Sequence, residues 1–563
     1  MRDHIADIVR HALGSAVADG ALPAVELPTV EIERPHDPAH GDYATNAAMQ
    51  LAKAAGMPPR AIAEAVVARM VGDPDIAAVE IAGPGFINIR LSAEALRQVV
   101  RKAREQGADY GRSDLGRGEK TQVEFVSANP TGPMHVGHGR WAALGDSLAR
   151  VLAHAGYDVS REFYINDAGV QMDIFAKSVA ARYLELAGQQ IAFGENWYRG
   201  AYITEIAQEI WDAEGAEYVA MPAEDRERIF RERAYKQVLD HLRHVLEGMG
   251  VVFDVWFSER ALHEPDAVDA VIAKLREGGY VYDADGAVWF RSTEFGDDKD
   301  RVMRKADGEY TYFAADVAYH EDKLERGFVH IIDIWGADHH GYVKRMEAAV
   351  AALGSPGALE VIIGQLVNLF RGGEVVRMSK RTGEMVTFEE LLDEVGADAA
   401  RYFFLRRSTD QPLDFDVALA KEQSADNPVY YVQYAHARIC SILRKAAKLP
   451  PEADVDVVSF VAGLVPVATD LAPLADDAEF ALVRKIAEIP EAVEVCARAR
   501  APYKLTRYAE DLAASFHQFY TVCRVIDEDA PAMTAARLYL VDATRLALET
   551  VLGLLGVSAP QRM

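Results

Sequence analysis

Cysteine is scarce in this chain of 563 residues: only Cys440, Cys496 and Cys523 occur, far apart in the sequence. Their spacing fits neither a disulfide framework nor a CxxC motif for zinc or redox chemistry, so a reducing, cytoplasmic location is expected. Long apolar runs are also missing, since no stretch approaches the roughly 18 to 20 apolar residues of a membrane-spanning helix. The sequence therefore argues against a disulfide-stabilised secreted fold and against a membrane protein.

Positive charge is in short supply too, because 60 Lys and Arg stand against 87 Asp and Glu, a net charge of −27. This balance argues against a protein that coats nucleic acid through bulk electrostatics, and any RNA would have to bind at local basic patches. The first 20 residues place Asp3 and Asp7 among apolar residues at helical spacing. They predict an amphipathic surface helix and not a targeting segment.

Hydrophobic periodicity divides the chain into three parts, a multidomain α/β organisation. Residues 1–110 predict a small α+β module, including a helix at 43–56. Residues 111–426 alternate strands with helices, with a helical insertion expected at about 174–290. Residues 427–563 show helical periods only, which predicts an all-α domain.

The middle part predicts a Rossmann-like parallel sheet. An apolar strand at 121–128, a helix at 140–155 and a second strand at 159–166 form a βαβ unit. The turn between the first strand and the helix holds the motif "HVGH", with His135 and His138 three positions apart. In a parallel sheet such a turn lies at the carboxyl edge, where the first N–H groups of the helix can bind phosphate.

The two histidines alone are ambiguous. A pair of surface histidines explains an isolated HxxH more simply, and a metal site is a second alternative that lacks the usual spacing and neighbouring ligands. A distant partner favours a phosphate site, since "GGEVVRMSKRTGEM" places Lys380 between Arg377 and Arg381 on a glycine-containing loop. By itself this loop would be an ordinary solvated charge run. No P-loop or GxGxxG motif offers another explanation for a phosphate site.

"HVGH" followed at long range by "RMSKR" resembles the two signatures of class I aminoacyl-tRNA synthetases, and "VEFVSANPTGPMHVGHGR" is similar to the arginyl-tRNA synthetase family in particular. The similarity extends over the whole chain, in the expected order. The other matching segments are "HGDYATNAAMQLAK", "GPGFINI", "YTYFAADVAYH", "WGADHHGY", "NPVYYVQYAHARI", "FHQFYTVCRV" and "LLGVSAPQRM". The second signature departs from the usual lysine-first form, so only Lys380 is assigned as its catalytic lysine.

The resemblance implies attachment of L-arginine to tRNA(Arg) through an arginyl-adenylate, with ATP and substrate-bound Mg²⁺ and no protein-held metal. It implies an N-terminal module that binds the tRNA elbow at 1–110, a catalytic domain at 111–426 and a helical anticodon-binding domain at 427–563. A monomer is expected. His135, His138 and Lys380 would be catalytic, and the ATP site would comprise His135, Gly137, His138, Met378, Ser379 and Lys380.

The resemblance also assigns the other two substrate sites. The arginine site would comprise Glu124, Ser127, Asn129, Tyr312, Asp316 and His340, with His339 as an alternative to His340. The tRNA contacts would be Phe86 and Asn88 in the N-terminal module and Tyr431, Tyr434 and Arg438 in the helical domain. For any single tyrosine of this helix, a place in the core is the simpler interpretation.

Two other functions compete with this one. A non-catalytic tRNA-binding paralogue could keep the fold, although it would have no reason to retain His135, His138, Lys380, Glu124 and Asp316 together. A nucleotidylyltransferase acting on a small molecule would share the phosphate signature, but it would have no use for the helical domain or the N-terminal module.

Overall fold

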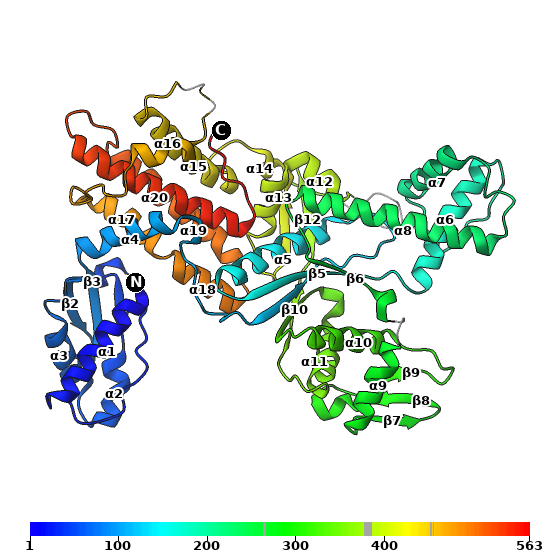
Figure 1. The fold of residues 1–563 in the computed structure, drawn as a ribbon, viewed down its shortest axis with the longest axis horizontal. Coiled ribbons are helices and arrows are strands. Elements are labelled where there is room, and N and C mark those ends of the chain that lie inside the picture. Colours follow the sequence, from blue (N-terminus) through cyan, green and yellow to red (C-terminus); the bar gives the residue numbers. More distant parts are fainter. Residues whose placement is uncertain (36, 263–265, 377–385, 451–452, 454) are drawn as a thin grey trace.

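A five-stranded parallel sheet lies at the centre of the molecule (Figure 1). The structure is a computed structural model, and it describes residues 1–35, 37–262, 266–376, 386–450, 453 and 455–563. The strand order is β11-β10-β4-β5-β6, and every neighbouring pair is parallel. The strands are β4 (Lys120–Glu124), β5 (Asp158–Ile165), β6 (Val255–Ser258), β10 (His330–Gly336) and β11 (Leu359–Gly364).

The expected βαβ unit is confirmed, and it fixes the middle of this sheet. β4 is the central strand, and its Thr121, Gln122 and Val123 are fully buried, as a strand covered on both faces requires. Helix α5 (Val136–His154) follows β4 and leads into β5. The turn with His135 and His138 therefore opens at the carboxyl end of the central strand, the edge at which parallel sheets bind ligands.

Residues 174–290, expected to be one helical insertion, are divided by the edge strand β6. Helices α6 (Val170–Leu186), α7 (Ala201–Glu214) and α8 (Ala223–Gly248) come before β6 and form the arm at the right of Figure 1. A second lobe follows β6. It contains η3 (Glu259–Leu262), α9 (Ala267–Glu277), η4 (Ser292–Phe295) and an antiparallel sheet of β7 (Val281–Ala284), β8 (Ala287–Phe290) and β9 (Arg301–Arg304). β6 has only four residues, too few to show the two-residue period of a strand, so the sequence does not distinguish it from the long helices around it.

The chain then returns to the main sheet through α10 (Tyr312–Glu325), and it leaves that sheet after β11. Helix α11 and the 3₁₀ helix η5 connect β10 to β11, and a small three-stranded sheet and three helices follow. These elements are η5 (Ala337–Tyr342), α11 (Val343–Ala352), β12 (Val367–Arg371), β13 (Glu374–Val375), α12 (Phe388–Val395), α13 (Ala397–Phe404), β14 (Leu413–Asp416) and α14 (Val417–Lys421).

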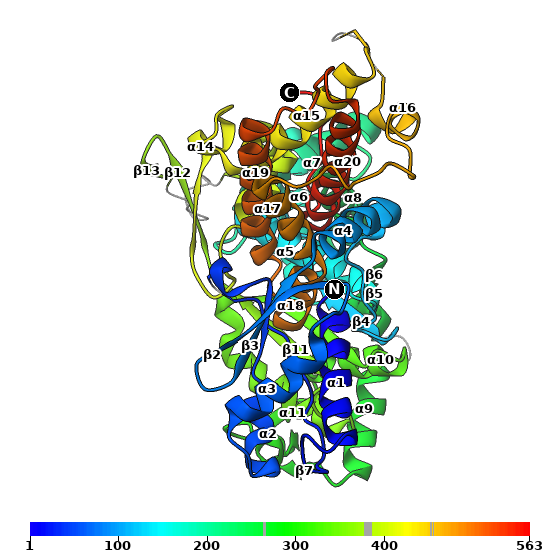
Figure 2. The ribbon, with the colours of Figure 1, turned by 90° about the vertical axis from the view of Figure 1, so that its left-hand side faces the viewer.

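The N-terminal module packs three helices on a three-stranded sheet and joins the rest through α4 (Figure 2). Its elements are α1 (Arg2–Ala18), η1 (Pro38–His40), β1 (Tyr43–Thr45), α2 (Ala47–Ala55), α3 (Pro59–Met70), β2 (Ile76–Ala82), β3 (Phe86–Leu91), α4 (Ala93–Gln106) and η2 (Gly107–Asp109). The helix expected at 43–56 begins later, because Tyr43 to Thr45 pair with β3 as a strand. Arg34 donates to Glu491, and Arg484 is paired with Asp42, so ion pairs tie the module to the C-terminal helices.

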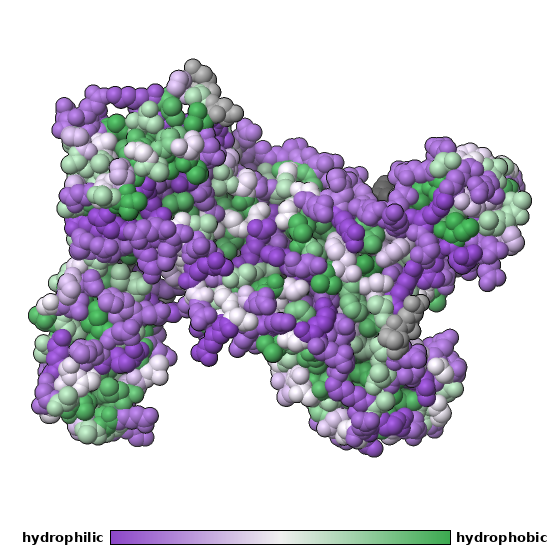
Figure 3. All heavy atoms as spheres, in the orientation of Figure 1, coloured by the Kyte–Doolittle hydropathy of each residue, from purple (hydrophilic) through white to green (hydrophobic). Residues whose placement is uncertain are grey.

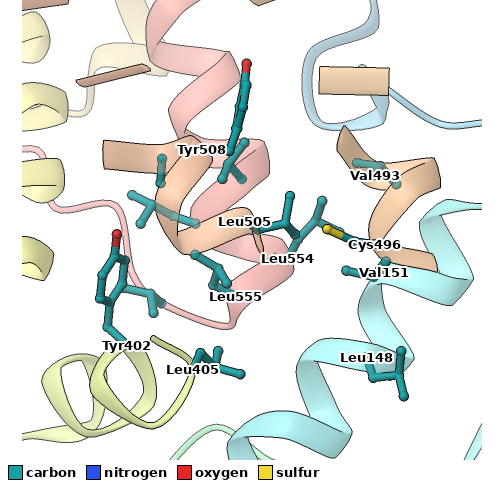
Figure 4. Close-up of a cluster of buried hydrophobic side chains, with 14 of the residues drawn as sticks. Leu148, Val151, Tyr402, Leu405, Val493, Cys496, Leu505, Tyr508, Leu554 and Leu555 are labelled. Atoms are coloured by element: carbon teal, nitrogen blue, oxygen red, sulfur yellow. The ribbon is translucent and has the colours of Figure 1, made fainter. Parts of the chain in front are cut away.

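The C-terminal part is helical, as expected, in all the regular elements that the structure describes from residue 427 on. These are α15 (Pro428–Ala446), α16 (Val457–Leu464), α17 (Asp477–Ala487), α18 (Ile489–Ala499), α19 (Tyr503–Val522) and α20 (Pro531–Leu555). Figure 4 shows buried side chains of α5, α13, α18, α19 and α20 in one cluster, so the core of this part is continuous with that around α5.

The outer surface is mixed in character. Figure 3 shows hydrophilic residues over every lobe of the visible face, with apolar residues in scattered groups between them. Among the residues that the structure describes, no helix combines the length and the apolar composition that a membrane span would need.

Arg401 of α13 joins three parts of the fold at a fully buried position. Its guanidinium is paired with Asp146 of α5 and donates to the carbonyl oxygens of Leu555 (3.1 Å) and Met249 (3.1 Å). We expect Arg401→Met to destabilise the protein by about 3–5 kcal/mol, because it leaves buried acceptors without their donor. The measurement is the thermal unfolding midpoint by calorimetry.

The matched control is Arg150→Met, because Arg150 binds the same Asp146 from a more exposed position. Its loss is expected to cost less than about 1 kcal/mol. Equal shifts for the two variants would contradict the role given to Arg401.

Candidate active site

The turn that follows β4 holds a strained backbone. Val126 (φ 69°) and Ser127 (φ 38°) both adopt left-handed conformations, which cost non-glycine residues about 1–2 kcal/mol each. The Ser127 hydroxyl donates to Glu124 Oε1 (2.9 Å) and accepts the N–H of Tyr164 (3.1 Å). These two bonds hold the turn between neighbouring strands, at the sheet edge where a binding site is expected.

His135 and His138 cap the amino end of α5. His135 is the N-cap residue, and His138 Nδ1 accepts the His135 backbone N–H (3.2 Å), while the His135 side chain accepts the N–H of His138. The two rings stack with their centroids 3.7 Å apart. Both imidazoles therefore lie over the positive end of the helix, where an anion would bind.

The two glycines of this motif have different surroundings. A Cβ at Gly137 would lie 2.9 Å from the His135 ring, and one at Gly139 would lie 2.3 Å from the ring of Phe388. At Gly139 the missing side chain makes room for α12, so its role is helix packing.

The expected second signature, Met378, Ser379 and Lys380, lies outside the described residues. The residues that follow it contact the first signature directly. Phe388 donates its N–H to the Met134 carbonyl (2.9 Å), and Thr387 forms a bridge with His135. Residues 387 and 388, about 250 positions along the chain from His135, thus lie against the turn that holds the first signature.

Three buried carboxylates form a row across the carboxyl end of the sheet. Asp333 of β10 is in register with Glu124 of β4, which is in register with Glu162 of β5. All three are less than 10% exposed. Asp333 and Glu162 were not among the predicted site residues, although a single acid inside the apolar strands "IIDIW" and "REFYI" is a signal that could have found them.

Helix α10 lies across this row and carries its partners on one face. Lys323 Nζ donates to Glu124 Oε2 (2.7 Å) and to Asp333 Oδ1 (2.9 Å). His320 Nε2 lies 3.0 Å from Asp333 Oδ2. Burial opposes the charge of Asp333, yet Lys323 and His320 hold its pKa at about 2.

Glu162 has its own partners on the same face of α10. Tyr319 donates its hydroxyl to Glu162 Oε1 (2.7 Å), and Arg326 donates to both carboxylate oxygens (2.6 and 2.9 Å). Burial disfavours the charged carboxylate, but the bond from Arg326 lowers the pKa of Glu162. This bidentate pair is complete without a ligand.

A second group of acids surrounds Tyr164 of β5. Burial raises the pKa of the Tyr164 phenol, and Glu259, Asp316 and Glu124 raise it further, in that order. Burial also raises the pKa of Asp316, whose carboxylate accepts the Tyr342 hydroxyl (2.5 Å). Burial, followed by the nearby Asp316, raises the pKa of Glu259 to about 7. Three carboxylates this close together favour binding of a cation.

The remaining predicted arginine-site residues lie farther out. Asn129 donates to Gln171 Oε1 (3.1 Å), and the Tyr312 hydroxyl lies near Gly169, so both meet the start of α6. Tyr312 is 69% exposed. His340, like its alternative His339, is exposed on η5. The structure thus brings Glu124, Ser127 and Asp316 together and leaves these others nearer to solvent.

Two further surfaces carry predicted binding residues. On α15 and α19 the rings of Tyr430, Tyr434 and His517 stack in series, and Arg438 lies over Tyr434 (5.6 Å) and Tyr520 (5.1 Å). We call these five residues the aromatic platform. The ring of Tyr431 lies beside it, 5.0 Å from that of His517.

On β3 of the N-terminal module, Phe86 and Asn88 are two residues apart and so lie on the same face of the strand. Phe86 is 40% exposed, whereas Asn88 is 9% exposed. Arg444, another basic residue of α15, is buried and donates to Gln561 near the C-terminus, so it stabilises the fold and is not available to bind RNA.

A parallel sheet with a histidine-capped helix at its carboxyl edge, and a helical domain behind it, is the architecture of class I aminoacyl-tRNA synthetases. Residues 100–425 match the family described as "tRNA synthetases class I (R), catalytic domain". Residues 3–91 match "Arginyl tRNA synthetase N terminal domain", and residues 432–563 match "DALR anticodon binding domain". The chain belongs to the arginyl-tRNA synthetase family.

Individual relatives agree over the full length. The chain is 50% identical to the arginine–tRNA ligase of Geobacillus thermodenitrificans, over 100% of this chain and 99% of the relative. It is also 50% identical to that of Moorella thermoacetica, over 99% and 98%. A solved arginyl-tRNA synthetase of Thermus thermophilus shares the fold, with a TM-score of 0.73, 23% identity and complete coverage of both chains.

Proposed function

We propose that the protein attaches L-arginine to tRNA(Arg), with an arginyl-adenylate as the intermediate. The observation that carries this proposal is the group of buried acids beside the histidine-capped end of α5. Relatives at about 50% identity over the full chain bear the arginine–tRNA ligase name, and nothing in these likenesses favours a non-catalytic paralogue.

The acids support arginine as the amino acid. In the described residues around the pocket, the carboxylates Glu124, Glu162, Glu259, Asp316 and Asp333 outnumber the cations Lys323 and Arg326. An excess of buried negative charge is costly until a cation binds. A guanidinium offers donors in a planar fork that suits two carboxylates, whereas a lysine ammonium would leave acceptors unpaired.

In this proposal Glu124 and Asp316 hold the guanidinium, with Ser127, Tyr312 and His340 completing the arginine site. Asn129, at the outer end of the same turn, takes the α-amino group. The arginine carboxylate then points toward the amino end of α5, where the phosphates of ATP would lie.

ATP would place its phosphates against His135, Gly137 and His138, with Met378, Ser379 and Lys380 on the other side. A carboxylate oxygen of arginine attacks the α-phosphorus and pyrophosphate leaves, so the site needs to stabilise charge more than to move protons. The 2′-hydroxyl of the terminal adenosine then attacks the arginyl carbonyl carbon, and AMP leaves. Mg²⁺ is proposed to enter bound to the triphosphate, as is usual for this ion.

Transfer RNA is proposed to bind at both ends of the molecule. Tyr434 and Arg438 of the aromatic platform, together with Tyr431 beside it, would stack on unpaired anticodon bases. Phe86 and Asn88 would contact the elbow of the tRNA. A cytoplasmic monomer is proposed as the working form.

Tyr434→Ala tests the platform, because Tyr434 is 37% exposed and its ring is the middle one of the stack. We expect the KM for tRNA to rise about 5- to 100-fold, since stacking on one base contributes about 1–3 kcal/mol. Ser441→Ala, at an exposed position on the same helix, is the control and should leave that KM unchanged. If tRNA binds Tyr434→Ala as it binds the unmodified protein, the platform is not the anticodon site.

The experiment that tests the function is exchange of labelled pyrophosphate into ATP, with arginine or lysine as the amino acid and with or without total tRNA. We expect exchange with arginine and not with lysine, and the family resemblance favours a requirement for tRNA. Protein that binds tRNA yet supports no exchange under any of these conditions would refute the enzymatic proposal.

A further inference from the structure

Lys323 is a fully buried cation that the proposed reaction does not use. It projects from the last turn of α10 toward β4 and β10 of the central sheet, where Glu124 and Asp333 accept its ammonium hydrogens at 2.7 and 2.9 Å. A lysine removed from water in this way is costly unless its charge is paired. Although burial opposes its protonation, Asp333 and Glu124 raise the pKa of Lys323, so it is charged.

The two acids that bind Lys323 differ in their other partners. Asp333 also contacts His320, 3.0 Å away, so two groups from α10 hold this carboxylate. Glu124 has the Ser127 hydroxyl on Oε1 and Lys323 on Oε2. Asp333 therefore anchors the ammonium, and the anchored ammonium fixes the direction in which the Glu124 carboxylate points.

The same helix carries the other acid of the pocket. Asp316 and Lys323 are seven residues apart on α10, which is about two turns or ~10 Å along the axis. Helix α10 begins at a Thr311 cap, whose hydroxyl accepts the N–H of Ala314 (3.3 Å). One helix thus sets the position of both carboxylates, Asp316 directly and Glu124 through Lys323.

We propose that Lys323 is a positioning residue that holds the Glu124 carboxylate in the orientation that binds the guanidinium of arginine. This inference rests on the proposed function. Lys323 does not touch arginine in this arrangement; each Glu124 oxygen keeps a lone pair for the guanidinium after binding Ser127 or Lys323. A Glu124 carboxylate already held by Lys323 loses less rotational freedom when arginine binds. This favours a higher affinity for arginine and selectivity for its planar guanidinium.

Lys323 also favours the ionised form of Glu124. Burial raises the pKa of Glu124, and the charge of Lys323 opposes that rise. Without the ammonium, Glu124 would take up a proton at a higher pH and would then no longer accept both guanidinium hydrogens. Other groups that bear on the same carboxylate are Asp333, Glu162, Tyr164 and Tyr319.

The test compares Lys323→Met and Lys323→Gln with a matched control, Lys274→Met. Lys274 is a partly exposed lysine of α9 that pairs with Glu321 on the opposite side of α10, so its loss also removes one ion pair from this helix. We expect the KM for arginine to rise at least tenfold in Lys323→Met at pH 8, and more at pH 6.5. The KM for ATP should stay within twofold, and the control should match the unmodified protein.

Lys323→Gln removes the charge and places its NH₂ group one bond short of the Nζ position that binds both acids, and it decides the question if Lys323→Met does not fold. Its KM for arginine should also rise as the pH falls from 8 to 6.5. A folded Lys323→Gln whose KM for arginine stays within twofold of the unmodified protein at both pH values would overturn the proposal.

A double-variant cycle separates positioning from a general effect on the fold. If Lys323 acts through Glu124, then Lys323→Gln should add less than a threefold change to a protein that already carries Glu124→Gln. Fully additive effects would overturn the proposal. Failure of the proposed function is recognised separately, since the unmodified protein would then show no arginine-dependent exchange.

Discussion

Asp316→Asn is expected to lower kcat/KM for arginine by about 10²- to 10³-fold, or about 3–4 kcal/mol. Asp316 is a half-buried acid that lies close to Glu259 and, with Glu259 and Glu124, surrounds Tyr164. An asparagine has the same shape, but it presents one acceptor and an NH₂ group where the guanidinium needs two acceptors. The bound cation would then be left partly unpaired.

The measurement is arginine-dependent pyrophosphate exchange at saturating ATP and tRNA. Glu325→Gln is the control, because Glu325 is an exposed acid at the end of the same helix and its replacement removes the same charge. The assignment of Asp316 fails if both variants keep their kcat/KM for arginine, or if the two lose it equally.

His138→Asn is expected to lower kcat by about 10²- to 10³-fold and to leave the KM for arginine within a few-fold of its original value. An asparagine oxygen can replace His138 Nδ1 as the acceptor of the His135 N–H, so the cap of α5 is retained. What is removed is an imidazole beside the phosphate position.

His154→Asn provides the matched control, since His154 lies at the other end of α5, with Nε2 3.1 Å from the Tyr110 carbonyl oxygen. Single-turnover adenylate formation, followed for both variants, should slow only for His138→Asn. An unchanged rate in that variant would mean that the histidine serves only to cap the helix.

Local patterns were enough to predict much of the fold. The βαβ unit around α5 and the helical C-terminal part follow from hydrophobic periodicity that repeats over many residues. The strand β1 and the edge strand β6 were missed, because three or four residues give almost no period and only pairing across the sheet makes them strands.

Some residues of the candidate site could likewise be predicted from the sequence, and others could not. His135, His138 and Glu124 stand in a contiguous motif, so their presence at the end of a strand could be read directly from the sequence. Asp333 and Glu162 stand out as acids within apolar strands, but their partners cannot be read from the sequence, and Lys323 is one of several charged residues in "HEDKLER". Their meaning comes from strand register and from the helix that crosses it.

The sequence by itself determined the order of the three parts, the turn with His135 and His138 at the end of a strand, and the family resemblance, because these depend on residues close together in the chain. The tertiary structure alone decided which acids lie close to one another and which are already paired with a lysine or arginine of the protein. The physical reason is that burial and pairing set the energy of a charge, and both depend on residues more than a hundred positions apart, as Lys323 and Glu124 are.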